Sequence, residues 1–342
     1  MKPLQAVKIK GQVLVLGGGV IGLCTALYLA EAGARVTVLE RDEFARQASW
    51  AGGGILSPLY PWRAPDPVWR LASRGIAIYP QLCADLARYT GVDPEWTGSG
   101  LLLRDRAEHS AATRFCHAEG LALHEGRAPG SLLLPWVAQL RNPRMCRALL
   151  MRLEQLGVTL RAHCGPLRLA LRGDKAQVML ADEALMADQI VVAAGAWSGL
   201  LLAETGWQLP IKPVAGQMIL LQGKPDQIPH IILADGRYLI PRRDGQILVG
   251  STLEDQGFTP HCTETALREL LLTASELAPE TKNMPVLKQW AGLRPGSPDG
   301  IPTIARHPQI RNLFVNAGHY RNGINLAPGS AMELLRLLAS AS

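Results

Sequence analysis

The chain has 342 residues, of which 48% are hydrophobic and 19% charged, a composition typical of a globular protein and not of a disordered or fibrous one. A single hydrophobic core rarely extends beyond about 250–300 residues, so we expect two lobes. The net charge of +6 comes mainly from arginines spread along the chain, which disfavours nucleic-acid binding and fits a preference for small anions as well as an ordinary solvated surface.

The first predicted elements form a strand–turn–helix–strand unit. Residues 12–16 are a Val- and Leu-rich run typical of a buried strand, residues 20–32 have helical character and end before Gly33, and residues 35–39 are a second strand. The stretch 13–30 carries no charge, which superficially matches a signal peptide or a membrane span. Glycines in its middle and the lack of a small-residue cleavage site favour the buried unit, so we expect no stable membrane insertion.

The turn of this unit, residues 17–22, reads GGGVIG. Gly17 permits a tight turn, Gly19 lets the backbone approach a pyrophosphate at the helix N-terminus, and Gly22 lets the helix pack on the strand. Glu40 follows Gly22 by 18 residues, at the end of the second strand, where a carboxylate accepts hydrogen bonds from ribose hydroxyls and repels a 2′-phosphate. A glycine turn that binds nothing is the alternative. The spacing favours a dinucleotide, disfavours NADP, and leaves FAD and NAD open.

The middle of the chain mixes helices and strands. Residues 49–67, rich in Gly, Pro and Trp, are expected to be mainly loop, and residues 68–88 to be helical. Short strands and helices follow over residues 91–140. A further helix is predicted over residues 145–156 and a strand over residues 158–162.

The last third contains more strands and one terminal helix. Residues 189–194 are a fully buried strand, and residues 238–241 and 246–250 flank RRDG, which indicates a hairpin. A core strand is predicted over residues 313–316 and the C-terminal helix over residues 329–338.

The cysteines form no C-x-x-C pair, and no histidine stands at zinc-ligand spacing from one. We therefore expect reduced thiols, several of them buried, in a cytoplasmic protein without a metal site. The six residues are Cys24, Cys83, Cys116, Cys146, Cys164 and Cys262.

Four further segments carry a resemblance to a known family. They read GGGIL at 52–56, AAGAWS at 193–198, WAGLRPGSPDG at 290–300 and NAGHYRNGINLAP at 316–328. Together with the glycine loop they resemble, in order and over nearly the whole chain, the D-amino acid oxidase (DAO) family of flavoenzymes, and its glycine oxidases of the thiamine pathway most of all. The glycine loop is generic, whereas WAGLRPG and GHYRNGI are specific to this branch.

The resemblance implies an α/β fold with a Rossmann-like FAD-binding domain of the glutathione-reductase/D-amino acid oxidase type. A second, α+β substrate domain would be built on an antiparallel sheet that roofs the flavin. The FAD-binding domain would comprise residues 1–80, 141–208 and 289–342, and the substrate-binding domain residues 81–140 and 209–288. Relatives that attach flavin covalently use a cysteine in the C-terminal segment. None follows Cys262 here, so FAD is expected to be non-covalent.

The resemblance also assigns site residues. Arg294 would hold the substrate carboxylate, with Tyr238 and Arg321 completing the substrate pocket. The backbone N–H groups of residues 319–325 would stabilise the reduced, anionic flavin. The implied FAD-binding residues are Gly17, Gly19, Val20, Ile21, Gly22, Glu40, Arg41, Ala48, Ser49, Gly53, Gly54, Ile55, Leu167, Ala194, Gly195, Trp197, His319, Tyr320, Arg321, Asn322, Gly323, Ile324 and Asn325.

Local chemistry supports the role of Arg294 independently. A planar guanidinium makes two parallel charge-assisted bonds to a carboxylate. Leu293 and Pro295 bracket Arg294 in an apolar, turn-rich segment, an unusual place for a solvated arginine, which is the alternative. Arg321 could equally serve structure, and Tyr238 could simply pack in the core.

The implied reaction is oxidation of glycine, a small amine or a D-amino acid by hydride transfer from Cα to flavin N5. Imine hydrolysis and reoxidation by O2 then give a 2-oxo acid, ammonia and H2O2. Catalysis would rest on positioning, so no catalytic base is assigned. Alternatives are a D-amino acid dehydrogenase or a sarcosine-type secondary-amine oxidoreductase with another electron acceptor, an oxidoreductase acting on tRNA wobble uridine, and a flavin-binding protein without turnover. Relatives commonly form homo-oligomers.

Two departures from the family pattern concern the substrate. Asn325 stands where these enzymes tend to have an apolar residue, and residues 58–67 lack a match to the usual acidic loop. We therefore expect the polarity of the pocket and access to the flavin to differ from those of relatives.

Overall fold

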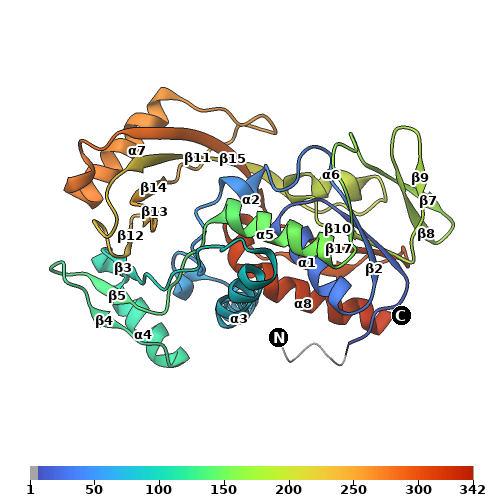
Figure 1. Cartoon of the computed structure of the whole chain (residues 1–342), viewed down its shortest axis with the longest axis horizontal. Coiled ribbons are helices and arrows are strands. Elements are labelled where there is room, and N and C mark those ends of the chain that lie inside the picture. Colours follow the sequence, from blue (N-terminus) through green and yellow to red (C-terminus); the bar gives the residue numbers. More distant parts are fainter. Residues whose placement is uncertain (1–6, 342) are drawn as a thin grey trace.

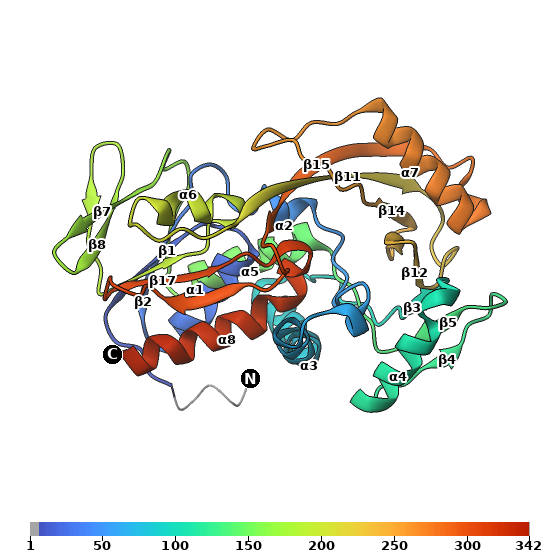
Figure 2. The same ribbon diagram turned by 180° about the vertical axis from the view of Figure 1, so that it is seen from behind.

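The computed structural model describes residues 7–341, and two large β-sheets that lie side by side dominate it (Figure 1). One has six strands in the order β16-β17-β10-β1-β2-β6, and the other has eight in the order β15-β11-β14-β13-β12-β3-β5-β4. A small sheet, β7-β8-β9, lies at the end of the molecule opposite helix α7 (Glu264–Leu277) (Figure 2). Within the described residues, no helix is both long enough and apolar enough to cross a bilayer.

The six-stranded sheet is parallel except for its edge strand β16, which runs antiparallel to β17. Parallel sheets are buried on both faces, which accounts for the unbroken Val, Leu and Ile runs of the central strands β1 and β10. Successive side chains point to opposite faces, so Val13 and Val15 pack in one core and Leu14 and Leu16 in another. The strands are β1 Gln12–Leu16, β2 Arg35–Leu39, β6 Thr159–Arg161, β10 Gln189–Val192, β16 Thr303–Arg306 and β17 Leu313–Ala317.

Helices α1, α3, α5 and α8 pack together on one face of this sheet, around the fully buried Tyr28, Tyr79 and Phe314. Helices α3 and α8 approach closely because α3 has a glycine there: a Cβ on Gly75 would lie 2.1 Å from the carbonyl oxygen of Asn325. Helix α6 and the small sheet cover the other face. Their bounds are α1 Val20–Glu31, α3 Asp66–Thr90, α5 Asn142–Gln155, α6 Ser198–Ala203, α8 Gly323–Ala341, β7 Arg168–Arg172, β8 Lys175–Met179 and β9 Ala184–Leu185.

The eight-stranded sheet is antiparallel except between β12 and β3. Its two long strands, β11 and β15, reach back to the first sheet (Figure 1). Helix α7 packs on one face through Leu270, and Met218 and Tyr238 belong to the core on the other. The elements are β3 Leu101–Leu103, β4 His124–Glu125, β5 Leu132–Leu134, β11 Lys212–Gln222, β12 Ile231–Ala234, β13 Arg237–Pro241, β14 Gln246–Gly250, β15 Val286–Gly296, and the helices α2 Ala48–Ala51 and α4 His109–Glu119.

The predicted β1–α1–β2 unit and the β13–β14 hairpin are confirmed, and the cysteines are free thiols, four of them buried. The buried strand predicted at 189–194 ends at Val192. The loop expected over residues 49–67 is wrong at both ends, since α2 covers residues 48–51 and α3 begins at Asp66. The segment around Arg294 is not turn-rich but lies within strand β15, because β11 pairs with it along its length.

The C-terminal helix begins at Gly323, six residues before the predicted start. The helix includes Pro328, although a proline inside a helix removes one N–H. The carbonyl that would accept from this position, that of Ile324, instead accepts a hydrogen bond from the hydroxyl of Tyr79. The missing donor is therefore replaced from helix α3, and the helix continues through the proline.

Two predicted domain boundaries fall inside continuous elements. Residue 80 lies within α3, which packs on α5 and α8, and β15 stays paired in the second sheet up to Gly296. We propose that the FAD-binding domain includes all of α3 and that the substrate-binding domain includes all of β15.

Candidate cofactor and substrate site

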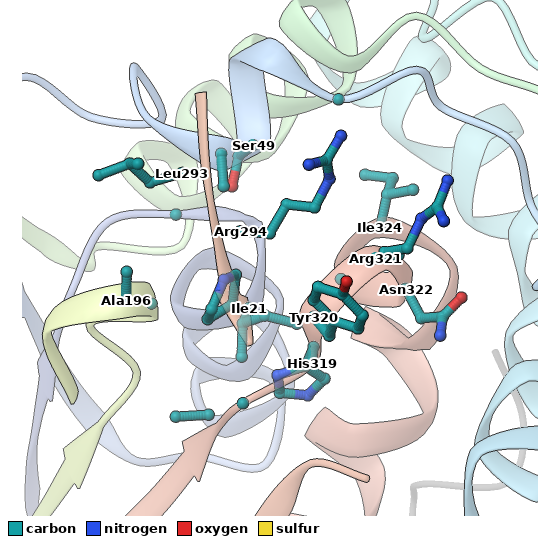
Figure 3. Close-up of a pocket in the computed structure, with 18 of the residues that line it drawn as sticks. Ile21, Ser49, Ala196, Leu293, Arg294, His319, Tyr320, Arg321, Asn322 and Ile324 are labelled. Carbon is teal, nitrogen blue, oxygen red and sulfur yellow. The ribbon is translucent and has the colours of Figure 1, made fainter. Parts of the chain in front are cut away.

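A cavity of about 810 Å³ lies at the carboxyl ends of β1, β2, β10 and β17, beneath the second sheet (Figure 3). That volume is at the large end of the ~300–1,000 Å³ usual for ligand sites. In the first sheet, β1 has β2 on one side and β10 on the other, and the edge where such strand order reverses is where open α/β sheets bind ligands. The cavity thus lies where a dinucleotide is expected.

The glycine loop forms one wall of the cavity. Gly17 has φ +112°, and a Cβ on it would lie 2.5 Å from the carbonyl oxygen of Ala193. The amide of Val20, in the first turn of α1, donates to Ser49 Oγ over 2.8 Å. That hydroxyl therefore stands at the helix N-terminus with its own proton free to donate to a phosphate oxygen.

Glu40 lines the same cavity at the end of β2. Its Oε2 accepts from Gly18 N over 2.8 Å and its Oε1 from Asp42 N over 3.1 Å, which orients the carboxylate and leaves further lone pairs for ribose hydroxyls. The guanidinium of Arg41 lies 4.5 Å from the centre of the Trp197 ring, and Leu167 lines the cavity nearby.

Two buried polar atoms in the cavity wall have no protein partner. The amide of Asn142 donates from Nδ2 to Ser49 O over 2.9 Å, but its Oδ1 is unpaired, and so is Nε2 of the buried His319. Burial lowers the pKa of His319 to about 3, so the imidazole is neutral. Unpaired buried polar atoms carry a cost that a ligand removes. The helix N-terminus, the oriented carboxylate and these two atoms together fit FAD.

The far end of the cavity carries Arg294. Its Nη1 donates to Ala215 O over 3.0 Å and its Nη2 to Ser251 Oγ over 2.8 Å, and it forms no ion pair with any described residue. The guanidinium lies against Gly216, where a Cβ would stand 2.2 Å from both Nη atoms. Burial lowers the pKa of Arg294. A partly buried cation with N–H groups to spare is suited to an anion.

Arg321 and Tyr238 also line the cavity, and both lie close enough to Arg294 to shift its pKa, Tyr238 upward and Arg321 downward. Figure 3 shows the guanidinium groups of Arg294 and Arg321 pointing to the same side, with Tyr320 between their bases. Arg321 is exposed and donates weakly to Gly236 O over 3.5 Å. Tyr238 is buried in β13, with its ring close to the backbone of Gly53.

The segment 58–67, whose departure from the family pattern was noted above, lines the cavity with several of its residues. The hydroxyl of Tyr60 donates to Asp105 and accepts from Gly236 N over 2.8 Å, and Arg63 pairs with Glu108. These contacts hold the segment against loops and a short helix that belong to the second sheet's side of the molecule. This part of the cavity wall therefore carries an aromatic and a cationic side chain, and both are held by contacts to other segments.

Of the residues assigned from the sequence, only Gly22 and Asn325 do not line the cavity. Gly22 instead lets helix α1 pack closely on the end of strand β1, because a Cβ there would lie 1.9 Å from the carbonyl oxygen of Gly17. Asn325 is buried, and its Nδ2 donates to Asn322 Oδ1 over 3.2 Å.

Three residues that contribute to the site were not predicted: Asn142, Gly216 and Ser251. A glycine inside a strand can indicate a close approach of another group, so Gly216 carried a signal. Asn142 and Ser251 carried none, because their partners, Ser49 and Arg294, are distant in sequence.

Comparisons with known proteins extend over nearly the whole chain. The sequence profile of the FAD-dependent oxidoreductases (DAO) matches residues 12–337. The chain is 45% identical to glycine oxidase from Pseudomonas putida, covering 96% of this chain and 95% of that one. The crystal structure of glycine oxidase from Geobacillus kaustophilus superposes with a TM-score of 0.90 at 26% identity, covering 96% and 94%. That of iminodiacetate oxidase from a Chelativorans species does so with a TM-score of 0.87 at 26% identity, covering 96% and 95%.

Proposed function

This chain belongs to the family of FAD-dependent oxidoreductases, and from that membership we propose that it oxidises glycine or another small amino acid or amine that carries a carboxylate. FAD is its cofactor, held without a covalent bond. The 45% identity to a glycine oxidase supports glycine as the first substrate to test. The likeness to an iminodiacetate oxidase supports secondary amines as the next class.

The observation that carries the proposal is the guanidinium of Arg294 in the cavity wall, which forms no ion pair with any described residue. A substrate carboxylate would give this cation the anionic partner that residues 7–341 do not supply. In this proposal Tyr238 and Arg321 close the substrate space on either side. The bound carboxylate fixes the distance and direction of the neighbouring Cα, and such orientation lowers the barrier of the reaction.

When bound, FAD accepts the hydride that leaves the substrate Cα. The chain's part is to bind the carboxylate, orient the amine and exclude water from the space between. We assign no catalytic base, because an amine that arrives neutral needs none. The imine released hydrolyses to a 2-oxo acid and ammonia, and O2 takes the electrons to give H2O2.

The proposal is tested by anaerobic mixing of the FAD-loaded protein with glycine, sarcosine, D-alanine, D-proline and D-arginine. We expect glycine to bleach the flavin absorbance, and peroxide to appear when O2 is admitted. Bleaching without peroxide, together with reduction of a quinone dye, would indicate a dehydrogenase instead. A flavin that none of these compounds reduces would contradict the proposal.

Replacement of Arg294 tests the substrate end separately from the cofactor end. Arg294→Ala removes a charge-assisted pair of bonds, so we expect KM to rise about a hundredfold for every carboxylate substrate, as is usual when one partner of a buried ion pair is lost. FAD stays bound, since no cofactor contact is removed. An unchanged KM would remove Arg294 from the substrate site.

Further properties follow from the family resemblance. We propose that the protein is cytoplasmic, forms homo-oligomers and takes part in the thiamine pathway. Gel filtration with light scattering tests the oligomeric state, and growth of a deletion strain without thiamine tests the pathway.

A further inference from the structure

Arg242, in the turn between β13 and β14, carries a buried charge that the proposed reaction does not use. Its Nη1 donates to Gln139 Oε1 over 2.7 Å and to Leu140 O over 3.0 Å, and its Nη2 donates to Gly53 O over 2.8 Å. All three acceptors are neutral. Burial lowers the pKa of Arg242 to about 10, which leaves it charged at neutral pH. The nearby carboxylates of Glu95 and Asp244 raise the pKa of Arg242, but burial outweighs them and neither carboxylate is hydrogen-bonded to the guanidinium. A buried cation held only by neutral acceptors is costly to keep, and that cost needs a reason.

Through these three hydrogen bonds, Arg242 connects the β13–β14 hairpin of the second sheet to two segments next to the cavity. Gly53 belongs to the loop that follows α2 and lines the cavity, and Leu140 precedes α5. Leu140 N also donates to Gly54 O over 2.9 Å. Gly54 has φ +80°, and a Cβ on it would lie 2.1 Å from Leu140 O. The loop therefore runs as bare backbone between the cavity on one side and the Arg242 guanidinium on the other.

The orientation of the Gly53–Gly54 peptide follows from these contacts. A trans peptide directs its C=O and N–H to opposite sides. Since the Gly53 carbonyl points to Arg242, the Gly54 N–H points away from it, and this N–H has no hydrogen-bond acceptor among the described residues. A charge bonded to the carbonyl polarises the peptide and makes the opposite N–H a stronger donor.

We propose that Arg242 is a positioning residue for the bound flavin, which holds the Gly53–Gly54 peptide with its N–H toward the cavity and places a fixed positive charge behind it. A positive charge there favours the flavin state with more negative charge, so it raises the reduction potential of the cofactor. The inference needs FAD in the cavity but does not depend on which substrate the enzyme oxidises.

The test compares Arg242→Gln, Arg242→Lys and a neighbouring control, Arg243→Gln. Arg243 belongs to the same turn but is exposed, and it pairs with Asp93 over 2.7 Å at the surface. For each purified variant, the FAD dissociation constant is measured by fluorescence quenching. The two-electron reduction potential of the bound flavin is measured by equilibration with a dye. Neither measurement uses a substrate, so a failure of the proposed glycine oxidation leaves the test intact.

We expect Arg242→Gln to weaken FAD binding about tenfold, the usual loss for a charge-assisted hydrogen bond. The equilibrium constant for reduction should also fall about tenfold, which is about 30 mV for a two-electron couple. Arg242→Lys keeps the charge without the fork, so it should weaken FAD binding while leaving the potential near that of the wild type. Arg243→Gln should change neither quantity.

A folded Arg242→Gln protein with wild-type FAD affinity and potential would overturn the proposal. If circular dichroism shows that this variant does not fold, Arg242→Lys tests the positioning role and the role of the charge separately. Unchanged FAD affinity in Arg242→Lys would overturn the positioning role. A fall in its potential as large as that expected for the neutral variant would overturn the role of the charge.

Discussion

The contact between Gly216 and Arg294 leads to a sharp prediction, because a single methyl group tests the placement of the guanidinium. The two residues are diagonal neighbours on β11 and β15, where Gly216 pairs with Gly292 and Arg294 pairs with Val214. A Cβ at position 216 would lie 2.2 Å from both Nη atoms, whereas real Cβ contacts essentially never fall below 3.0 Å. In Gly216→Ala the guanidinium must therefore move.

The displacement has a predictable cost. Moving the guanidinium by most of an ångström breaks its bonds to Ala215 O and Ser251 Oγ, now 3.0 and 2.8 Å long. A 1 Å misplacement of a positioning group can cost about a hundredfold in rate. We expect kcat/KM for glycine to fall by about that factor, mainly through KM. The fold should survive, since alanine is at least as favourable as glycine inside a strand.

The assay is steady-state peroxide production with glycine, alongside the FAD dissociation constant and the melting temperature. Gly98→Ala is a matched control, because its nearest neighbour, the Trp96 side chain, would lie at an ordinary 3.5 Å from the new Cβ. A third variant, Arg294→Lys, completes a double-mutant cycle with Gly216→Ala. Lysine lacks the planar guanidinium that the new methyl group would contact. Gly216→Ala should therefore lower kcat/KM much less in the Arg294→Lys background.

Two results would refute this reasoning. If Gly216→Ala keeps the wild-type kcat/KM, Arg294 does not need its observed position. If Gly216→Ala lowers kcat/KM by the same factor in the Arg294→Lys background, displacement of the guanidinium is not the cause of the loss.

Three further predictions concern other contacts. Ser251→Ala removes one hydrogen bond that holds Arg294, worth about 1 kcal/mol, so KM for glycine should rise roughly fivefold while FAD affinity, measured by fluorescence, stays the same. Tyr79→Phe leaves the carbonyl of Ile324 without its donor; calorimetry should show a loss of about 1–2 kcal/mol, or roughly 2–4 °C in Tm per kcal/mol. His319 has its pKa lowered by burial to about 3 in the folded state, so between pH 6.5 and about 3 the unfolded chain binds the extra proton. The free energy of unfolding should therefore fall as the pH drops through that window, and a plot of Tm against pH should be flatter for His319→Gln; identical curves would contradict this.

The cofactor end of the site was largely predictable because its signals are local. The strand, the glycine turn, the helix and the acid at position 40 lie within about 30 consecutive residues, and each has a distinct residue pattern. The structure has β1, α1 and β2 at the predicted positions, and Glu40 at the cavity wall.

The errors arose where a distant residue replaces a local requirement. The predicted helix began at residue 329, just after Pro328, which removes an N–H from the helix. The helix nevertheless extends back to Gly323, and the hydroxyl of Tyr79, 245 residues away in sequence, supplies a donor to the carbonyl of Ile324. The segment of Arg294 was taken for a turn because of its glycines and prolines. It is a strand because β11, some 80 residues earlier, pairs with it.

The amino-acid sequence by itself indicated a dinucleotide site, because that signal depends on residue types at short spacings. Its resemblance to the D-amino acid oxidase family indicated FAD, and with it the cation that we propose to face the substrate. Only the tertiary structure decided how that cation is held, since Ala215, Gly216 and Ser251 reach Arg294 through pairing of strands far apart in the chain. It also decided that Arg242 is buried behind the cavity wall. Burial and hydrogen-bond partners are properties of the packed chain, and no local pattern specifies them.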